Sequence, residues 1–346
     1  MSADAIVVGA GICGAAAAHF LAERGAEVLV LDRAGVAEGT TGLGEGNVLV
    51  CDKPPGIERD LAVRGRELWG RLGERFAAAR VTRKGALVLD HPDGADMSPL
   101  EPSLAAGIRC VHEPDELQVD PAGLARAMLA PLRVITSAEV LSVDAGSVTL
   151  AGGDRRHADH VIVATGPWAA ELTGLPVQPR KGQLAALSAP PELIRHKLIE
   201  AAYTDVVAST GAERLIATVV EQTLDGDEVL VGSSRERVGF DPRVDDRVTA
   251  AMIGRAARFV PALAQLPVRR AWCGFRPWLP DGLPAVGPIG DRVWTSCGHE
   301  GSGVGLGPLS GLLLAQLIAG EDPVCDPSPV DPRRFGSRCP VPTVPR

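Results

Sequence analysis

The hydrophobic positions at the start of the chain follow a strand, helix and strand pattern. Residues 5–8 form a short apolar run, residues 15–24 have a helical composition, and residues 27–31 form a second apolar run. Gly25 separates the last two segments, at a position where glycine commonly ends a helix. Buried strands joined by a helix are the unit from which parallel sheets are built. The pattern therefore predicts one β-α-β unit.

The periodicity of the next segments changes repeatedly. Between residues 57 and 80, apolar side chains recur at the spacing of an amphipathic helix. Asp120 and Pro121 form a good first turn for a helix over 121–129. We expect the extended runs that follow to form an antiparallel meander, which leads into a buried strand at 161–164. These runs are 133–136, 139–143 and 147–151.

The second half of the chain has a different pattern. Between residues 183 and 237, short apolar runs predict several strands of an antiparallel sheet, and a helix is expected at 246–260. From residue 322 onward, prolines are frequent and apolar side chains are few, which predicts an extended tail. We therefore expect an α/β fold with a Rossmann-like domain and a smaller α+β domain built on an antiparallel sheet.

Composition and charge restrict the class of protein. The chain has 346 residues, 45% of them hydrophobic, which is enough for one large domain or two. The net charge of −8 provides no basic surface for nucleic acid or an anionic membrane. The first residues lack the positive segment of a signal peptide, and the apolar stretch around 309–319 is shorter than the roughly 20 residues that cross a bilayer. We expect a cytoplasmic protein without a membrane span or a nucleic-acid partner.

The cysteines carry little information about function. There are 7 of them, at positions 13, 51, 110, 273, 297, 325 and 339, without a C-x-x-C pair. An odd number without paired spacing predicts neither a disulfide framework nor a metal or iron–sulfur site. We expect most of them to be buried thiols.

The first glycine motif predicts a dinucleotide site. Gly9, Gly11 and Gly14 form G-x-G-x-x-G directly after the first predicted strand. These glycines allow a tight turn, close approach of helix N–H groups to a pyrophosphate, and close helix–strand packing. Asp32 ends the second strand, where a carboxylate can bind ribose hydroxyls and disfavours the 2′-phosphate of NADP. The motif itself serves both NAD and FAD.

Two later segments favour FAD. The strand at 161–164 ends in the small-residue turn Thr165-Gly166, and a glycine-rich loop at 298–305 opens a helix predicted at 308–319. A helix N-terminus after such a loop places partial positive charge where a reduced flavin develops negative charge. A simple NAD domain needs no such element. An NAD-dependent dehydrogenase remains the alternative, and it predicts a colourless protein.

Together these segments resemble the D-amino-acid oxidase family of FAD-dependent oxidoreductases, in particular its glycine oxidase and sarcosine oxidase branch. The resemblance covers the first glycine motif, Thr40-Thr41, 161–168, 176–183, 274–287 and 298–311. It implies two interleaved domains. The FAD-binding domain would comprise 1–78, 119–178 and 273–325, and the substrate-binding domain 79–118 and 179–272, followed by a tail at 326–346.

The resemblance also implies which residues bind FAD. They are Gly9, Ala10, Gly11, Ile12 and Gly14 at the pyrophosphate, Asp32 at the ribose with its neighbour Arg33, Thr40 and Thr41 at the phosphates, Gly46 and Asn47 near the isoalloxazine ring, Val140 at the adenine, Thr165, Gly166 and Trp168, and Gly301, Ser302, Gly303, Val304 and Gly305 at the pyrimidine edge. Monomeric sarcosine oxidases attach their flavin through a cysteine near this region. Here Cys273 precedes the matching Gly274, so we expect noncovalent FAD and a core thiol.

Arg276 matches the family arginine that holds the substrate carboxylate. A guanidinium fork suits this role because two parallel charge-assisted hydrogen bonds fix the position and orientation of a carboxylate. From the residue alone, a structural ion pair is the alternative. Family enzymes transfer a hydride from the substrate α-carbon to flavin N5, which requires an aligned amine more than a protein base. The implied reaction is oxidation of the C–N bond of glycine, sarcosine, a proline-like or a similar small amine to an imine.

Other pocket candidates are less defined. Asn47, Tyr203, His299 and Glu300 are the remaining candidates for contact with substrate. Tyr203 could equally have a packing role, and His299 and Glu300 could stabilise their loop. In glycine oxidase this loop supplies a further arginine, whereas the matching position here is Gly301. The inner pocket must therefore differ.

Two short segments resemble a subgroup of the family. Residues 44–53 and 232–236 are similar to flavoprotein subunits of multi-component amino-acid dehydrogenases, including hydrogen cyanide synthase and hydroxyproline dehydrogenase types. The resemblance implies partner electron-transfer subunits. The alternative function is therefore an FAD-binding, electron-relaying subunit that is inactive alone.

Overall fold

The computed structural model describes residues 3–203 and 214–336, and the predicted N-terminal β-α-β unit is present. β1 (Ala3–Val8) pairs in parallel with β2 (Val28–Leu31), and α1 (Ile12–Ala22) connects them. β1 also pairs in parallel with β12 (Arg155–Val163), so it lies inside the first sheet. β19 (Val293–Cys297) and β9 (Arg133–Ile135) extend the parallel strands on either side.

Both faces of this parallel sheet are covered. On one face α1 packs with α3 (Ile57–Arg75), α4 (Pro121–Leu129) and α8 (Gly303–Ala319) in one hydrophobic core. On the other face the hairpin of β10 (Val140–Asp144) and β11 (Ser147–Leu150) packs with β12. Burial of both faces explains why the central strands are continuous apolar runs.

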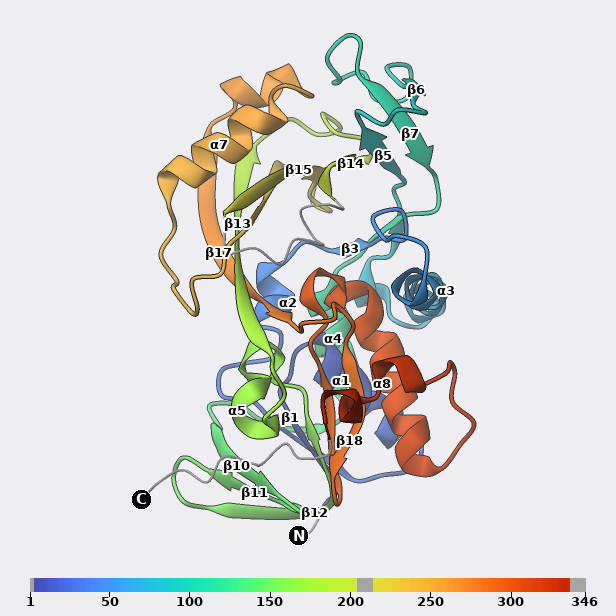
Figure 1. Cartoon of the computed structure of the whole chain (residues 1–346), viewed down its shortest axis with the longest axis vertical. Coiled ribbons are helices and arrows are strands. Elements are labelled where there is room, and N and C mark those ends of the chain that lie inside the picture. Colours follow the sequence, from blue (N-terminus) through green and yellow to red (C-terminus); the bar gives the residue numbers. More distant parts are fainter. Residues whose placement is uncertain (1–2, 204–213, 337–346) are drawn as a thin grey trace.

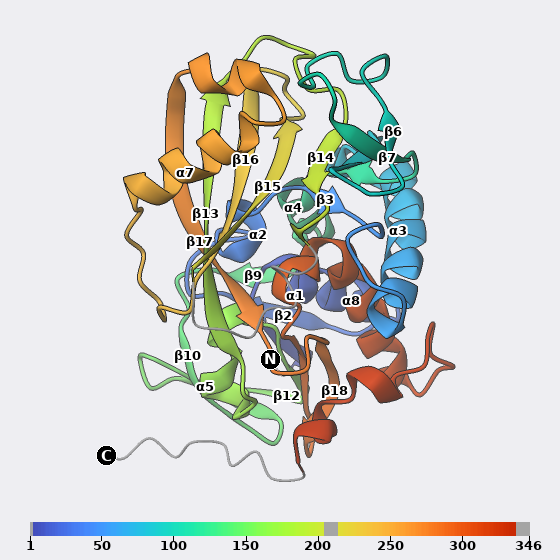
Figure 2. The same cartoon turned by 45° about the horizontal axis from the view of Figure 1, so that its top comes forward.

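The second sheet lies above the first in Figure 1. Its strand order is β17 (Val268–Trp278), β13 (Gln178–Ser188), β16 (Glu228–Arg235), β15 (Leu215–Gln222), β14 (Lys197–Glu200), β5 (Ala86–Leu89), β7 (Arg109–Glu113) and β6 (Ala95–Asp96). Among these described strands all neighbours are antiparallel except β14 and β5. α7 (Asp246–Ala256) covers one face of the sheet and completes a separate core (Figure 2).

Two long strands connect the halves of the molecule. β13 and β17 pair from Gln178 and Trp278 to Leu187 and Val268, and they extend from the second sheet down beside α5 (Ala169–Thr173) in Figures 1 and 2. The expected domain boundary at 272/273 falls inside β17. The domain limits therefore remain a prediction, because a single ladder runs across that boundary.

Short elements complete the fold. They are α2 (Thr40–Leu43), β3 (Asn47–Val48), β4 (Thr82–Arg83), β8 (Leu117–Gln118), β18 (Ala285–Gly290), and 3-10 turns at Ala77–Ala79, Gly166–Trp168, Pro261–Gln265, Glu300–Ser302, Ser328–Val330 and Pro332–Phe335. The described part of the expected tail forms the last two of these turns, and Val330 is buried in the first core.

Two expectations about these elements were wrong. The run 133–136 does not join a meander, because β9 pairs in parallel with β2 instead. The helix expected at 308–319 begins at Gly303 and contains Pro308. Proline lacks the N–H that would bind the carbonyl four residues earlier, which is that of Val304. The indole Nε1 of Trp69 donates to this carbonyl at 2.9 Å, and so the helix continues through Pro308.

Within the described residues, one helical stretch, Glu300–Ala319, is long and apolar enough to span a membrane by length and composition. It exceeds the stretch expected from the sequence because α8 starts earlier. Half of its apolar window is buried in the protein, where α8 packs on α1 and α3. The core helix of a globular protein has the same properties, so this stretch alone is weak evidence for a membrane span.

Candidate active site

One cavity of about 350 Å³ lies between the ends of the first-sheet strands and one face of the second sheet. It brings together residues that are far apart in the sequence. The predicted FAD-binding residues that line it are Gly9, Gly11, Ile12, Asp32, Arg33, Thr40, Thr41, Asn47, Val140, Thr165, Gly166, Trp168, Gly301, Ser302, Gly303, Val304 and Gly305. The predicted pocket residues Tyr203, Arg276, His299 and Glu300 line it as well.

Three predicted residues lie outside the cavity lining. Ala10 is buried, and its N–H donates to Asp32 Oδ2 at 2.7 Å. A Cβ on Gly14 would lie 1.9 Å from the carbonyl oxygen of Gly9, so glycine is required there for helix–strand packing. A Cβ on Gly46 would lie 1.8 Å from the carbonyl oxygen of Val119. Gly46 therefore serves the close approach of two backbones, although its neighbour Asn47 reaches the cavity.

The N-terminus of α1 forms a small-residue cradle. Gly9 has a φ of +109°, and a Cβ there would lie 2.4 Å from the carbonyl oxygen of Ala164. The hydroxyl of Thr41 accepts from the N–H of Ile12 at 3.0 Å, whereas the hydroxyl of Thr40 donates to the carbonyl of Phe275 at 2.7 Å. A hydroxyl and the positive end of a helix thus lie together, which suits a phosphate group.

The N-terminus of α8 forms a second cradle on the same cavity. The hydroxyl of Ser302 donates to Glu58 at 2.6 Å, which links the start of α8 to α3. A Cβ on Gly65 of α3 would lie 2.6 Å from the carbonyl oxygen of Gly305, so the two helices are in backbone contact. The side-chain oxygen of Thr165 is buried and lacks a hydrogen-bond partner among the described residues. These features fit a cofactor with a phosphate group at α1 and a polar ring edge at α8.

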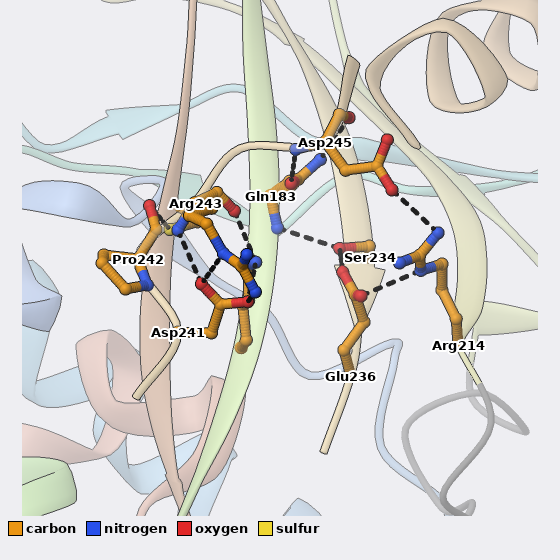
Figure 3. Close-up of polar contacts among 10 residues, drawn as sticks. Gln183, Arg214, Ser234, Glu236, Asp241, Pro242, Arg243 and Asp245 are labelled. Atoms are coloured by element: carbon orange, nitrogen blue, oxygen red, sulfur yellow. Dashed lines mark hydrogen bonds and ion pairs between the residues drawn. The ribbon is translucent and has the colours of Figure 1, made fainter. Parts of the chain in front are cut away.

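A loop over 237–245 supports one wall of the cavity. Figure 3 shows Gln183 of β13 bound to the backbone of Asp245 through two hydrogen bonds, at 3.1 and 2.6 Å. The loop carries Phe240, whose ring stacks on Trp168 with 5.2 Å between centroids. Because Trp168 lines the cavity, the polar network fixes an aromatic support behind it.

Arg33 contacts the same tryptophan. Its guanidinium lies 3.7 Å from the centroid of the Trp168 ring, in cation–π geometry. Both side chains line the cavity.

Arg276 reaches the cavity from β17. A Cβ on Gly182 of the neighbouring β13 would lie 2.1 Å from Nη1 of Arg276, so the glycine provides the space for the guanidinium. This Nη1 donates to the carbonyl of Ser234 at 3.0 Å. Burial and the nearby Arg235 lower the pKa of Arg276, and Glu300 opposes this change. The Ser234 carbonyl takes one N–H of the guanidinium, which leaves other donors for a ligand.

Glu300 is the counter-ion of a group of arginines. Its Oε1 accepts from Arg180 Nη1 at 3.4 Å and from Arg235 Nε at 3.3 Å. Burial raises the pKa of Glu300, but Arg235, Arg276 and Arg180 outweigh burial and lower the pKa to about 2. Its φ of +45° is unusual for a residue other than glycine. Sequence reasoning missed Arg180, and it included Arg235 only as part of the segment 232–236 that resembles the subgroup.

Tyr203 and His299 have defined partners. The hydroxyl of Tyr203 accepts from Arg235 Nη2 at 3.0 Å, so Tyr203 extends the arginine–glutamate group. His299 lies 2.9 Å from the hydroxyl of Ser310 through Nε2, and burial lowers its pKa to about 4. His299 therefore binds a side chain of α8 and is neutral near pH 7.

Asn47 leads to a polar group that the sequence had indicated only weakly. Its Nδ2 donates to Glu45 Oε2 at 2.6 Å, and Lys197 Nζ donates to the same oxygen at 2.7 Å. Glu45 and Asn47 line the cavity, whereas Lys197 lies behind them. The signal was the charged residues within 44–53, which sequence reasoning could also attribute to an ordinary loop.

The expectation that Cys273 is a core thiol was wrong. Its thiol is partly exposed, donates to the carbonyl of Pro242 at 3.2 Å and is outside the cavity lining. The reason is its position on β17, where the edge of the sheet leaves the side chain beside the 237–245 loop. The described cysteines form no disulfide with one another, and only Cys110 and Cys297 among them are buried. The described residues contain no cluster of three or more His, Cys, Asp or Glu side chains suited to a metal ion.

Comparison with known proteins finds similar flavoenzymes and a similar fold. Glycine oxidase of Pseudomonas aeruginosa is 28% identical over 96% of this chain and 99% of its own length. The HcnC subunit of hydrogen cyanide synthase from the same species is 33% identical over 52% of this chain and 41% of its own length. Glycine oxidase from Geobacillus kaustophilus has the same fold, with a TM-score of 0.83 at 24% identity, covering 95% of this chain and 98% of that chain.

The sequence matches one protein family over most of its length. The family is DAO, FAD dependent oxidoreductase, and the match covers residues 4–317. The α1 and α8 cradles and the acid at the end of β2 are the features that an FAD cofactor requires. The chain therefore belongs to the DAO family of FAD-dependent oxidoreductases.

Proposed function

We propose that this enzyme oxidises the C–N bond of a small amino acid or secondary amine to an imine. The observation that carries the proposal is the position of Arg276, a half-buried arginine that lines the same cavity as the N-terminus of α8. A carboxylate on this guanidinium would hold the adjacent C–N bond near the flavin end of the cavity.

Each residue of the pocket has a separate task in this proposal. Arg276 binds the substrate carboxylate with donors that remain after its bond to Ser234. Glu300 stays ionised and fixes Arg180 and Arg235 behind the pocket. FAD, when bound noncovalently, supplies the acceptor for a hydride from the substrate α-carbon. The protein contributes orientation and exclusion of water rather than a base.

The test compares two arginines on the same strand. Arg276→Ala should weaken anaerobic flavin bleaching by a panel of amino acids by about 100-fold or more in kcat/KM, because a desolvated charge-assisted fork is lost. Arg269→Ala removes an exposed arginine of β17 outside the cavity and serves as the matched control. Absence of bleaching by every carboxylated amine would disprove the proposal.

A second candidate is an electron-relaying subunit that requires a partner. The similarity to the HcnC subunit of hydrogen cyanide synthase supports it, as do the segments 44–53 and 232–236. Under this candidate the purified chain binds FAD but fails to oxidise any amine with an artificial acceptor. Turnover by the purified chain alone would eliminate it.

A further inference from the structure

The cavity contains a second polar region besides Arg276. Glu45 and Ser233 both line the cavity, and they come from the two segments whose role the proposed reaction leaves unexplained. Glu45 Oε1 and the hydroxyl of Ser233 are shielded from solvent and lack a hydrogen-bond partner among residues 3–203 and 214–336. A Cβ on Gly232 would lie 3.3 Å from Glu45 Oε1, so this oxygen lies against β16 one residue before Ser233.

The other oxygen of Glu45 is fully engaged. Oε2 accepts from Asn47 at 2.6 Å and from Lys197 at 2.7 Å, and Lys197 also pairs with Glu221 at 3.5 Å. Burial lowers the pKa of Lys197, but Glu221 and Glu45 outweigh burial and raise it. The lysine is therefore charged and fixes the carboxylate, while Oε1 has no hydrogen-bond partner among the described residues.

A buried acceptor without a hydrogen-bond partner destabilises the folded protein. Such groups in native proteins usually have a ligand or water as partner. Glu45 Oε1 can only accept and the hydroxyl of Ser233 can accept or donate, and both residues line this cavity, so together they indicate a donor group on the ligand. Glycine and sarcosine have no such group beyond the amine.

Part of the cavity wall is apolar. Leu184, Ile199 and Val219 of the second sheet line the same cavity. Glu45 and Arg276 line the same cavity, so both residues can contact one ligand. This cavity suits an aliphatic side chain that ends in a hydrogen-bond donor.

We propose that Glu45 and Ser233 form a specificity site for a hydroxyl or ammonium group on the substrate side chain. The substrate class would then be α-amino or imino acids whose side chain carries such a donor, rather than glycine or sarcosine. This inference rests on the proposed function, because the substrate carboxylate is assigned to Arg276.

The test uses carboxylates that lack an α-amine. FAD-loaded protein is titrated with butanoate, 4-hydroxybutanoate and 4-aminobutanoate, and binding is followed by the change in flavin absorbance. The parent should bind at least one of the two donor-bearing ligands about tenfold or more tightly than butanoate, since a hydrogen bond to a charged group contributes about 1.5–3 kcal/mol. Tighter binding of 4-hydroxybutanoate would identify a hydroxyl as the donor, and tighter binding of 4-aminobutanoate would identify an ammonium group.

The variant Glu45→Gln converts the acceptor into a donor with little change of shape. Its carbonyl can keep the bonds to Lys197 and Asn47, so its NH₂ takes the place of Oε1. It should lose the discrimination and still bind butanoate. Ser233→Ala should reduce the discrimination in part. Glu221→Gln is the matched control and should retain it, because Glu221 contacts Lys197 but does not line the cavity.

Two results would overturn the inference. One is equal affinity of the parent for plain and donor-bearing carboxylates. The other is a Glu45→Gln variant that changes the spectrum of ligand-free holoenzyme but keeps the discrimination, which would assign Glu45 to the flavin. Both results leave the proposed reaction intact. That reaction fails by a different observation, namely carboxylate binding that is insensitive to Arg276→Ala.

Discussion

Gly182 and Arg276 belong to adjacent strands, and the missing side chain of one provides the space for the guanidinium of the other. A Cβ on Gly182 would lie 2.1 Å from Nη1 and 2.7 Å from Cζ of Arg276. β13 and β17 are paired over their full length, so neither backbone can move away easily. The arginine side chain is the part that would yield.

Gly182→Ala should therefore displace the guanidinium while the FAD site stays intact. A displacement of about 1 Å at a positioning group can lower kcat/KM by about 100-fold. We expect a loss of this size for carboxylated amines, measured by anaerobic flavin reduction, with an unchanged FAD content. An unaltered kcat/KM would show that this guanidinium does not position the substrate.

Glu300→Gln should destabilise the protein strongly. The change leaves Arg180 and Arg235 buried without their carboxylate, and loss of one partner of a buried ion pair typically costs about 3–5 kcal/mol. Urea denaturation of the holoenzyme measures the change in the free energy of unfolding. Asp227→Asn removes one partner of the exposed pair with Arg269 and should leave the midpoint nearly unchanged. Similar midpoints for both variants would contradict the role of Glu300.

The ionised Glu300 should also make the folded protein less stable at low pH. Its folded pKa of about 2 lies below the ordinary value of 4.5, so its contribution to stability is complete above pH 4.5 and is lost as the pH falls towards 2. The pH dependence of the unfolding midpoint should therefore be weaker in Glu300→Gln than in the parent over this range.

His299 should control stability at a higher pH. Burial lowers its pKa from 6.5 to about 4, so the unfolded chain takes up a proton more readily than the folded protein below pH 6.5. Stability is complete above pH 6.5 and declines as the pH falls to about 4. His299→Gln should make the unfolding midpoint depend less on pH between these values. An unchanged pH dependence would show that the histidine is not buried in its neutral form.

Local sequence signals predicted much of the fold. Asp120 with Pro121 gave the correct bounds of α4, and its carboxylate caps the helix by accepting from the N–H of Gly123. In contrast, the place of β9 depends on its pairing with β2, which local alternation does not encode. Extended segments look alike whether their neighbour is parallel or antiparallel.

In the candidate site, too, the sequence indicated local features but not long-range pairings. The glycine motifs were recognisable because close backbone approach restricts the residue type at each position. The charge pairs were not, since Glu300 lies 120 positions from Arg180, and Glu45 lies 152 positions from Lys197. A single charged residue in a sequence does not reveal whether it is buried or exposed. Such pairs require the fold.

Two glycines of α3 give a matched test of the link between α3 and the cofactor site. A Cβ on Gly65 would lie 2.6 Å from the carbonyl oxygen of Gly305, whereas a Cβ on Gly70 would meet no atom within 4 Å. Alanine in place of an unconstrained helical glycine stabilises by about 0.5–1 kcal/mol, but overpacking costs about 1–3 kcal/mol. Gly70→Ala should therefore raise the free energy of unfolding, and Gly65→Ala should lower it.

The two variants should also differ in FAD affinity. Gly305 belongs to the first turns of α8 and lines the cavity, so pressure from a methyl group added at Gly65 would move backbone that faces the cofactor. We expect Gly65→Ala to lose FAD at a lower urea concentration than the parent, as measured by flavin fluorescence, and Gly70→Ala to retain it. Equal FAD retention in both variants would mean that α3 does not hold the start of α8 in place. The contact would then serve packing alone.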